Sequence, residues 1–295
     1  MNESRRGVLF GAASYGMWGL FPLYWPLLAP ATDWEVLAHR MLWSLVVVVA
    51  LVRLTGRGAS VRRVLTDRNR VLRLALAAAL LTVNWGTYIY GVNSGHVLET
   101  SLGYFVNPIV TVLLGVVVLR ERLRPVQWLA VGVATVAVLV LTLQSGRPPW
   151  IALILAASFG CYGLVKKTIG VGAVEGFVVE TAVLAPAAAG YLVLVGGGSF
   201  AGHGPSHTLL LISTGLVTTV PLLLFAGAAS RLPMYALGVM QYLAPTMQFL
   251  IGVTVRHEPL PALRVVGFGL VWVGLAIFTG DLVRERRRQV PLAAA

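Results

Sequence analysis

Long apolar runs, separated by short polar gaps or gaps containing proline and glycine, make up most of this 295-residue chain. A helix needs about 17–25 mostly apolar residues to cross a bilayer, and ten runs reach that length. None shows the alternation of apolar and polar positions over about ten residues that marks the strands of membrane barrels. We therefore predict an all-α integral membrane protein with ten transmembrane helices, at residues 7–29, 34–52, 71–91, 97–119, 125–143, 149–165, 174–195, 208–229, 234–255 and 261–280.

The apolar pattern occurs twice along the chain. Leu102–Gly132 recurs as Val239–Gly269, and Ala12–Leu20 (AASYGMWGL) recurs as Ala156–Leu164 (AASFGCYGL), with six of nine positions identical. At an offset of 137 residues, the first pair matches Pro108, Gly115, Glu121, Leu123 and Gly132 with Pro245, Gly252, Glu258, Leu260 and Gly269. We therefore predict two five-helix repeats, at residues 1–145 and 146–283, followed by a basic tail at 284–295.

The composition indicates that lipid surrounds most of the chain. Hydrophobic residues make up 57% and charged residues 12% of the sequence, whereas a soluble domain has about 25% charged residues. A net charge of +12 would suit a nucleic-acid partner, but the basic residues lie in the gaps between apolar runs, so we expect no nucleic-acid binding. The single cysteine, Cys161, excludes an internal disulfide and a cysteine-based metal motif.

The basic residues occupy alternate gaps. With ten helices, 19 of the 23 Lys and Arg residues fall on the side of the N-terminus: Arg5, Arg6, Arg53, Arg57, Arg62, Arg63, Arg68, Arg70, Arg73, Arg120, Arg122, Arg124, Lys166, Lys167, Arg231, Arg284, Arg286, Arg287 and Arg288. Because Lys and Arg gather on the cytoplasmic side, we expect a multi-pass protein of the cytoplasmic (inner) membrane with both termini in the cytoplasm. The run 7–29 is longer than the apolar core of a signal peptide, about 7–15 residues, so we expect it to remain as a helix of the mature protein.

An odd number of helices in each repeat has a structural consequence. The second repeat must cross the membrane upside down relative to the first, so Glu121 and Glu258 would face opposite sides. Inverted repeats of this kind build alternating-access transporters, whose substrate site lies near the membrane midplane where the repeats meet. A duplication that serves packing alone is the alternative.

Several short motifs support a family resemblance. They are Ala38-His39-Arg40 with Trp43, Asn84-Trp85, Glu99 followed by Ser101–Phe105, Asn107-Pro108, Glu121-Arg122, Gln127–Ala130, Tyr162–Val165, Glu180-Thr181, Thr218–Leu222, Gln241-Tyr242 and Ala244–Thr246. In these residues the chain resembles the EamA-domain members of the drug/metabolite transporter superfamily, and within them the RarD (chloramphenicol-sensitive protein) family. The resemblance extends from about residue 5 to about residue 285. It implies a permease of the cytoplasmic membrane for small metabolites or drugs, and it carries over no substrate-binding residues.

Polar side chains form one face of the predicted helix 97–119. At about 100° per residue, that face gathers Glu99, Thr100, Gly103, Tyr104, Asn107 and Thr111, with His96 just before the helix. Gln241 and Gln248 match Tyr104 and Thr111 in the second repeat, and helix 71–91 adds Asn84, Trp85 and Tyr88. We expect this face to line a substrate pathway. The alternative is a seam of hydrogen bonds between helices with no substrate.

Ionisable residues inside the predicted spans are candidates for coupling, because a charge in the bilayer costs at least about 2.5–3.5 kcal/mol. Glu99 is the first candidate for carrying a proton and Glu180 the second. His39 and Arg40 are candidates near the outer surface, where Arg40 could instead neutralise Glu99 or Glu35. For Glu121 and Glu258, each just before a new helix, we expect helix capping.

These observations predict a secondary transporter of a small organic metabolite or drug that works by alternating access, exports its substrate and needs no cofactor or metal. Proton coupling is a further hypothesis. ATP-driven transport is disfavoured because the chain has no G-x-x-x-x-G-K-[ST] loop, and an integral-membrane enzyme because its five histidines form no H-E-x-x-H pattern. A non-transporting scaffold or sensor partner stays open, as does the choice between a monomer and a homodimer.

Overall fold

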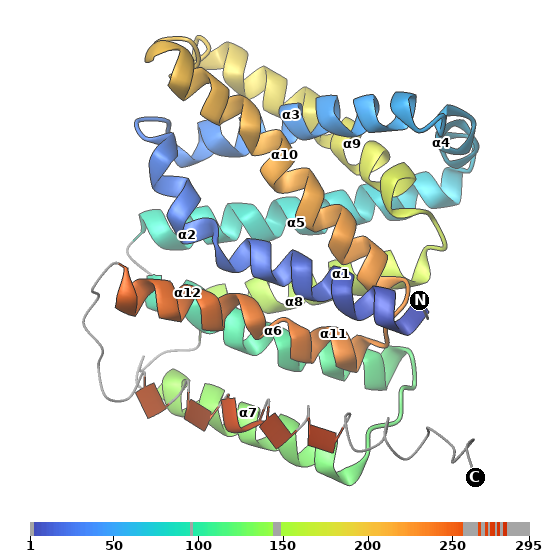
Figure 1. Cartoon of the computed structure of the whole chain (residues 1–295), viewed down its shortest axis with the longest axis vertical. Coiled ribbons are helices and arrows are strands. Elements are labelled where there is room, and N and C mark those ends of the chain that lie inside the picture. The colour runs from blue at the N-terminus through green and yellow to red at the C-terminus, as the bar shows by residue number, and fades with distance from the viewer. Residues whose placement is uncertain are drawn as a thin grey trace, which may run out of the picture.

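The computed structural model describes residues 3–94, 97–143 and 149–255, and the short pieces 265–266, 269–270, 272–274, 276–277 and 280–281. All regular structure in these residues is helical (Figure 1). The elements are α1 (Glu3–Gly19), α2 (Phe21–Tyr24), η1 (Trp25–Leu28), α3 (Asp33–Leu54), α4 (Gly58–Leu65), α5 (Arg68–Asn93), α6 (Val97–Val118), α7 (Pro125–Leu143), α8 (Trp150–Thr168), α9 (Ala173–Leu194), α10 (Gly204–Ala229), α11 (Met234–Met240) and α12 (Leu243–Thr254).

The helices confirm the membrane-protein fold class. Within the described residues, α3, α5, α8, α9 and α10 are long and apolar enough to cross a membrane, and α6 and α7 contain shorter apolar stretches. These seven helices coincide with seven predicted spans to within four residues at each end. The tenth predicted span, 261–280, lies outside the described residues except for its short pieces.

Two predicted spans are broken into shorter helices, each next to prolines. Residues 7–29 form α1, α2 and η1, because Pro22 and Pro26 cannot donate the backbone hydrogen bonds that would continue one helix. Residues 234–255 form α11 and α12, with a turn at Gln241 and Tyr242. Pro245 has no N–H for the carbonyl of Gln241, so the chain bends there.

The short helix α4 was also not predicted. It lies between α3 and α5, where the sequence indicated only a basic loop. Val61 and Val64 are buried while Arg62 and Arg63 are exposed, so α4 is amphipathic. A helix of this kind lies along the surface of a membrane rather than across it.

The packing of the helices repeats between the two halves. Under the sequence repeat, α1, α3, α5 and α6 correspond to α8, α9, α10 and α11–α12. Helix α6 packs on α8 as α12 packs on α1, and α5 packs on α8 as α10 packs on α1. These main packing contacts therefore occur in both halves, as expected for two copies of one unit.

The equivalent helices α6 and α11 run in opposite directions. Along α6, Phe105 accepts a hydrogen bond from Tyr242 (3.3 Å), while Gly115, ten residues further along α6, lies against Met234. Between them, Gly238 lies against Val112 in a contact too close for a side chain at this position. Residue numbers rise along one helix as they fall along the other, which is the arrangement that an inverted repeat requires.

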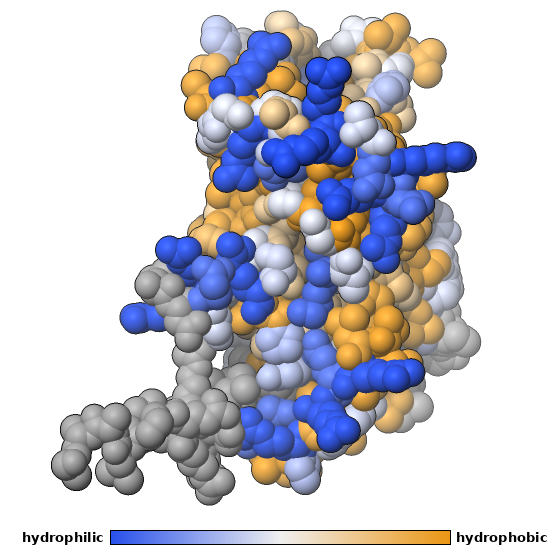
Figure 2. Space-filling view, turned by 90° about the vertical axis from the view of Figure 1, so that its right-hand side faces the viewer, coloured by the Kyte–Doolittle hydropathy of each residue, from blue (hydrophilic) through white to orange (hydrophobic). Residues whose placement is uncertain are grey.

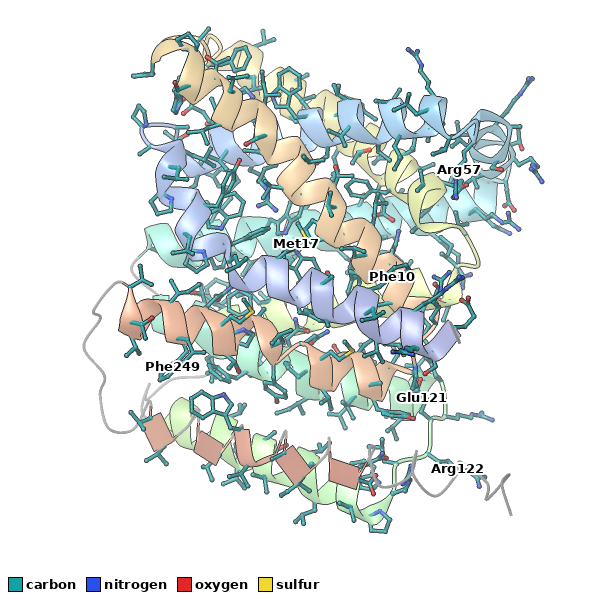
Figure 3. All side chains as sticks on the ribbon, in the orientation of Figure 1. Phe10, Met17, Arg57, Glu121, Arg122 and Phe249 are labelled. Carbon is teal, nitrogen blue, oxygen red and sulfur yellow. The ribbon has the colours of Figure 1, made fainter. Side chains whose placement is uncertain are left out.

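The segments between helices that carry most of the Lys and Arg residues lie together at one end of the bundle. Arg57, Glu121 and Arg122 lie at this end (Figure 3), and hydrophilic side chains are spread across it with apolar surface between them (Figure 2). Ion pairs join separate segments here: Arg231 with Glu3 (2.7 Å), Arg57 with Glu175 (3.3 Å) and Arg124 with Asp281 (3.3 Å). The alternate gaps that are basic in the sequence thus meet on one side, which we call the basic end.

Candidate functional site

A cavity of about 370 Å³ lies where elements of both repeats meet. Its walls are largely aromatic, with Tyr15, Trp18, Phe21, Trp25, Trp85, Tyr88, Tyr104 and Phe159 among the lining residues. Its polar lining consists mainly of Asp33, Arg40, Asn84, Asn107, Gln241 and Gln248. The cavity is large enough for a small organic molecule.

The cavity occupies the half of the bundle away from the basic end. On α3 it is lined only by the first two turns, up to Arg40, whereas the last turn of α3 leads to Arg57 at the basic end. The half next to the basic end is filled by buried apolar side chains of α3, α9, α10 and α11, among them Val48, Val52, Phe177, Phe225 and Met234. The cavity is therefore closed toward the basic end.

The two breaks in the predicted helices border this cavity. Phe21, Pro22 and Trp25 come from the broken first span, and Gln241 and Pro245 from the broken ninth span. Broken helices at the midplane are a feature of transporter sites, because unwound backbone there faces a cavity rather than lipid.

Eight of the eleven candidate residues line the cavity: Arg40, Asn84, Trp85, Tyr88, Tyr104, Asn107, Gln241 and Gln248. His39 and Glu180 are not among the lining residues. Glu99 belongs to α6, but its side chain lies outside the described residues, as does the whole of His96. The sequence missed Tyr15, Trp18 and Trp25 as lining residues, because an aromatic residue in an apolar run carries no signal of which way it faces.

The amide side chains of the cavity also hold helices together. Asn84 donates to the Leu155 carbonyl (2.9 Å) and to Ser158 (3.0 Å), which links α5 to α8. Gln241 donates to Thr111 (3.1 Å), and Gln248 donates to the Trp18 carbonyl (3.1 Å). The hydrogen-bond seam considered as an alternative is therefore present, and it borders the cavity.

Arg40 differs from these amides. Its guanidinium lies over the rings of Trp25 and Trp85, at 4.8 and 4.4 Å from their centroids. Its Nε donates to Thr218 of α10 (2.9 Å). Among the described residues it forms no ion pair, so the alternative of a pair with Glu35 is not found; the alternative of a pair with Glu99 lies outside the described side chains.

Glu35 and His39 face away from the cavity. Glu35 forms a capping box with Thr32 at the start of α3 and accepts from the Ser199 backbone N–H (2.7 Å). His39, one turn further, is buried and stacks on Phe200 (5.1 Å). This stripe of α3 holds the segment between α9 and α10, while Arg40, the next residue, turns to the cavity.

Glu180 has a partner on a neighbouring helix. Its carboxylate accepts from the Lys166 ammonium (2.6 Å) and from the Tyr162 hydroxyl (3.3 Å), and both charged side chains are almost fully buried. A buried charge is tolerated when it is paired and hydrogen-bonded in this way. The pair joins α8 to α9 and lies outside the cavity lining.

Glu121 caps a helix, although not the helix that follows it. Its two oxygens accept from the backbone N–H groups of Met234 (2.8 Å) and Tyr235 (3.1 Å), at the start of α11. At the start of α7, Gln127 instead accepts from the Arg124 N–H (3.0 Å). The expected role is confirmed for Glu121 with a different helix as its target, and Glu258 lies outside the described residues.

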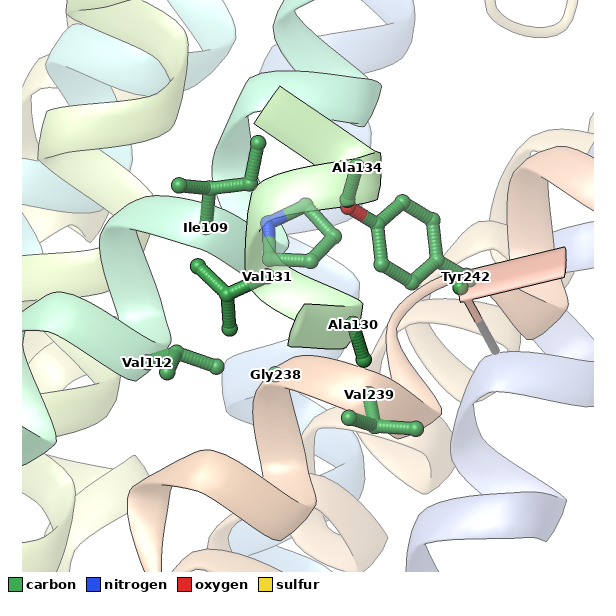
Figure 4. A pocket seen from close by; sticks show the side chains of 10 residues that line it. Ile109, Val112, Ala130, Val131, Ala134, Gly238, Val239 and Tyr242 are labelled. Carbon is green, nitrogen blue, oxygen red and sulfur yellow. The ribbon is translucent and has the colours of Figure 1, made fainter. Parts of the chain in front are cut away.

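A second, smaller cavity lies between α6, α7 and α11 (Figure 4). Its volume is about 20 Å³, and it is lined by apolar groups such as Ile109, Val112, Val131 and Val239. That volume holds about one water molecule, so it is no site for an organic solute. Within the described residues, no three His, Cys, Asp or Glu side chains come together as a metal site.

Comparisons with known proteins agree with this architecture. The model of the EamA-like transporter family matches residues 5–143. Protein RarD of Streptomyces exfoliatus is 51% identical over 290 residues, which cover 97% of this chain and 92% of that protein. The uncharacterized transporter YojE of Bacillus subtilis (strain 168) is 43% identical and covers 97% of each chain, and protein RarD of Escherichia coli (strain K12) is 43% identical and covers 97% of this chain and 98% of that protein.

A solved crystal structure shares the fold, with a TM-score of 0.71 at 20% identity over 92% of this chain and 97% of that one. The similarity to the RarD proteins extends over nearly the full length of the chain. Membrane-spanning helices, inverted repeats and a central cavity are the architecture expected of such proteins. This chain therefore belongs to the EamA-like transporter family of the drug/metabolite transporter superfamily, among its RarD-like members.

Proposed function

We propose that this protein is a secondary transporter that exports a small organic solute across the cytoplasmic membrane by alternating access. The observation that carries the proposal is the central cavity of about 370 Å³, which is lined by helices of both repeats and bordered by their breaks. Inverted repeats that enclose one central site can expose it to either side by rocking against each other.

The direction in which the cavity opens follows from the charge distribution. Lys and Arg favour the cytoplasmic side of a membrane, so we assign the basic end, and with it the N-terminus, to the cytoplasm. The cavity lies in the opposite half, where Asp33 at the start of α3 is exposed. The conformation described here would then be open to the outside and closed to the cytoplasm.

We keep the hypothesis that Glu99 couples transport to protons. Its basis is that Glu99 belongs to α6, whose Tyr104 and Asn107 line the cavity. Glu180 is a weaker candidate, since its carboxylate is already paired with Lys166 away from the cavity.

Counter-flow of solutes in reconstituted vesicles tests the proposal. Gln248→Trp would fill part of the cavity, and we expect it to abolish counter-flow of any solute that the unmodified protein moves. Leu250→Trp is the matched control, because Leu250 lies on the same helix with an exposed side chain. We expect this control to keep counter-flow. The scaffold alternative would be favoured if the well-folded protein showed no counter-flow of any solute in a broad metabolite panel.

A further inference from the structure

We propose that the central cavity binds organic anions with an apolar body, and that the Arg40 guanidinium is the anchor for the anionic group. This inference deepens the proposed function and rests on it. A carboxylate or another planar oxyanion is the chemistry that a guanidinium recognises best, through two parallel hydrogen bonds.

The guanidinium is held in a fixed position at the cavity wall. Trp25 and Trp85 stack on it, and the bond from Nε to Thr218 sets its rotation. These three contacts come from η1, α5 and α10, so they depend on the folded bundle rather than on α3 alone. An arginine that is positioned before the ligand arrives loses less side-chain entropy on binding.

The hydrogen-bond donors of the cavity are distributed unequally. The amide nitrogens of Asn84, Gln241 and Gln248 donate to groups on neighbouring helices. Arg40 uses only Nε in this way, and its two terminal nitrogens, with four N–H groups, have no acceptor among the described residues. Asn107 also keeps its amide N–H groups, but Arg40 offers the largest set of remaining donors and is the only cationic side chain among the lining residues that the structure describes.

The positive charge of Arg40 also lacks a counter-charge nearby among the described residues. Of the carboxylates described in the spanning helices, Glu35 is bound to Thr32 and Ser199, Glu180 to Lys166, and Glu175 to Arg57 at the basic end. Asp33 lines the cavity too, but it lies seven residues before Arg40, about 10 Å along α3, and is exposed. A cation inside a membrane without a partner is costly, so an anionic ligand at Arg40 would be favoured over a neutral or cationic one.

The remaining wall indicates what the rest of the ligand is like. Tyr88 and Tyr104 contact each other edge to face (6.1 Å) and line the cavity together with Trp18 and Phe159. Aromatic side chains favour apolar and aromatic groups, which they contact with their faces and edges. We therefore expect an amphipathic anion rather than a small inorganic ion.

Three probes share the same ring and differ in charge. Near neutral pH, phenylacetate is anionic, phenylacetamide is neutral and 2-phenylethylamine is cationic. Their affinities for the purified full-length protein in lipid nanodiscs can be measured by calorimetry. We expect phenylacetate to bind at least tenfold more tightly than the other two. Equal binding of phenylacetate and phenylacetamide would overturn the proposal, and tightest binding of the amine would point to Asp33 as the anchor instead.

Variants assign the preference to Arg40. We expect Arg40→Gln to bind phenylacetate and phenylacetamide within about threefold of each other, because the charge is gone while the cavity remains. Arg40→Lys keeps the charge without the planar fork, so it should keep a smaller preference for the anion, and it serves where Arg40→Gln fails to fold. A purely structural arginine would change the affinity for all three probes alike, which would also overturn the proposal.

Arg231→Gln is the matched control. Arg231 likewise lies over an aromatic ring, that of Phe10 (5.5 Å), but at the basic end and outside the cavity lining. The preference for the anion should be unchanged in this variant.

The binding and the transport proposals can fail separately. Anion binding without counter-flow of any solute would contradict the transport proposal alone. Counter-flow by a protein that binds the amine most tightly would contradict the anion site alone.

Discussion

At the scale of single residues, some polar groups in the membrane only hold helices together, whereas others also line the cavity. Glu180 and Asn84 both carry contacts between helices, with Lys166 in the first case and Ser158 in the second. Of the two, only Asn84 lines the cavity as well. The sequence could not reveal these partners, since Lys166 and Glu180 lie on different helices and Arg40 and Thr218 are 178 residues apart.

The two candidate coupling acids should respond differently to loss of charge. We expect Glu180→Gln to lower the free energy of unfolding by about 3–5 kcal/mol, because it leaves the Lys166 charge buried without a partner. This loss appears as a lower melting temperature, and adding Lys166→Met should restore much of the lost stability.

Glu99→Gln should instead abolish uptake driven by a pH gradient while solute exchange continues, because exchange needs no net proton movement. Undiminished gradient-driven uptake by Glu99→Gln would remove Glu99 from the coupling role.

At the scale of helices, the sequence located most spans because a long apolar run has few alternatives to a membrane helix. It gave one span each for residues 7–29 and 234–255, where the structure has separate helices, since an apolar run looks the same whether it forms one helix or several. It missed α4 because two buried valines among arginines are too few to show helical periodicity. Eight of the lining residues were found from the polar helix faces, Trp85, Tyr88 and Tyr104 among them, whereas the aromatic residues Tyr15, Trp18 and Trp25 were not.

The cap on α11 joins the two repeats at the basic end. Glu121 follows α6 of the first repeat and binds the first N–H groups of α11 in the second repeat. We expect Glu121→Ala to lower the free energy of unfolding by about 0.5–2 kcal/mol, the usual cost of losing a helix cap. Thermal unfolding measures this loss. Glu3→Gln is the control: Glu3 is an exposed acid paired with Arg231, and exposed pairs contribute little, so no change is expected. Equal melting temperatures for Glu121→Ala and the unmodified protein would contradict the capping role.

At the scale of the whole molecule, the inverted repeat gives the proposed transporter a way to close one side while the other opens. Equivalent helices α6 and α11 cross in opposite directions beside the cavity. Toward the basic end the repeats are joined by the Glu121 cap and by the ion pair of Arg57 with Glu175 (3.3 Å). An inward-open state would have to break these contacts and form their equivalents at the other end. The two repeats would thereby exchange conformations.

The orientation of the molecule in the membrane can be tested with single cysteines in a Cys161→Ser background. Ser206, at the start of α10, and Ala59, in α4, are both exposed and lie on opposite sides of the predicted membrane. Because the basic end should face the cytoplasm, an impermeant maleimide added to intact cells should label Ser206→Cys and spare Ala59→Cys. After permeabilisation both should react, which shows that Ala59→Cys is accessible and was protected by the membrane. Labelling of Ala59→Cys in intact cells would invert the topology, and the cavity would then open to the cytoplasm.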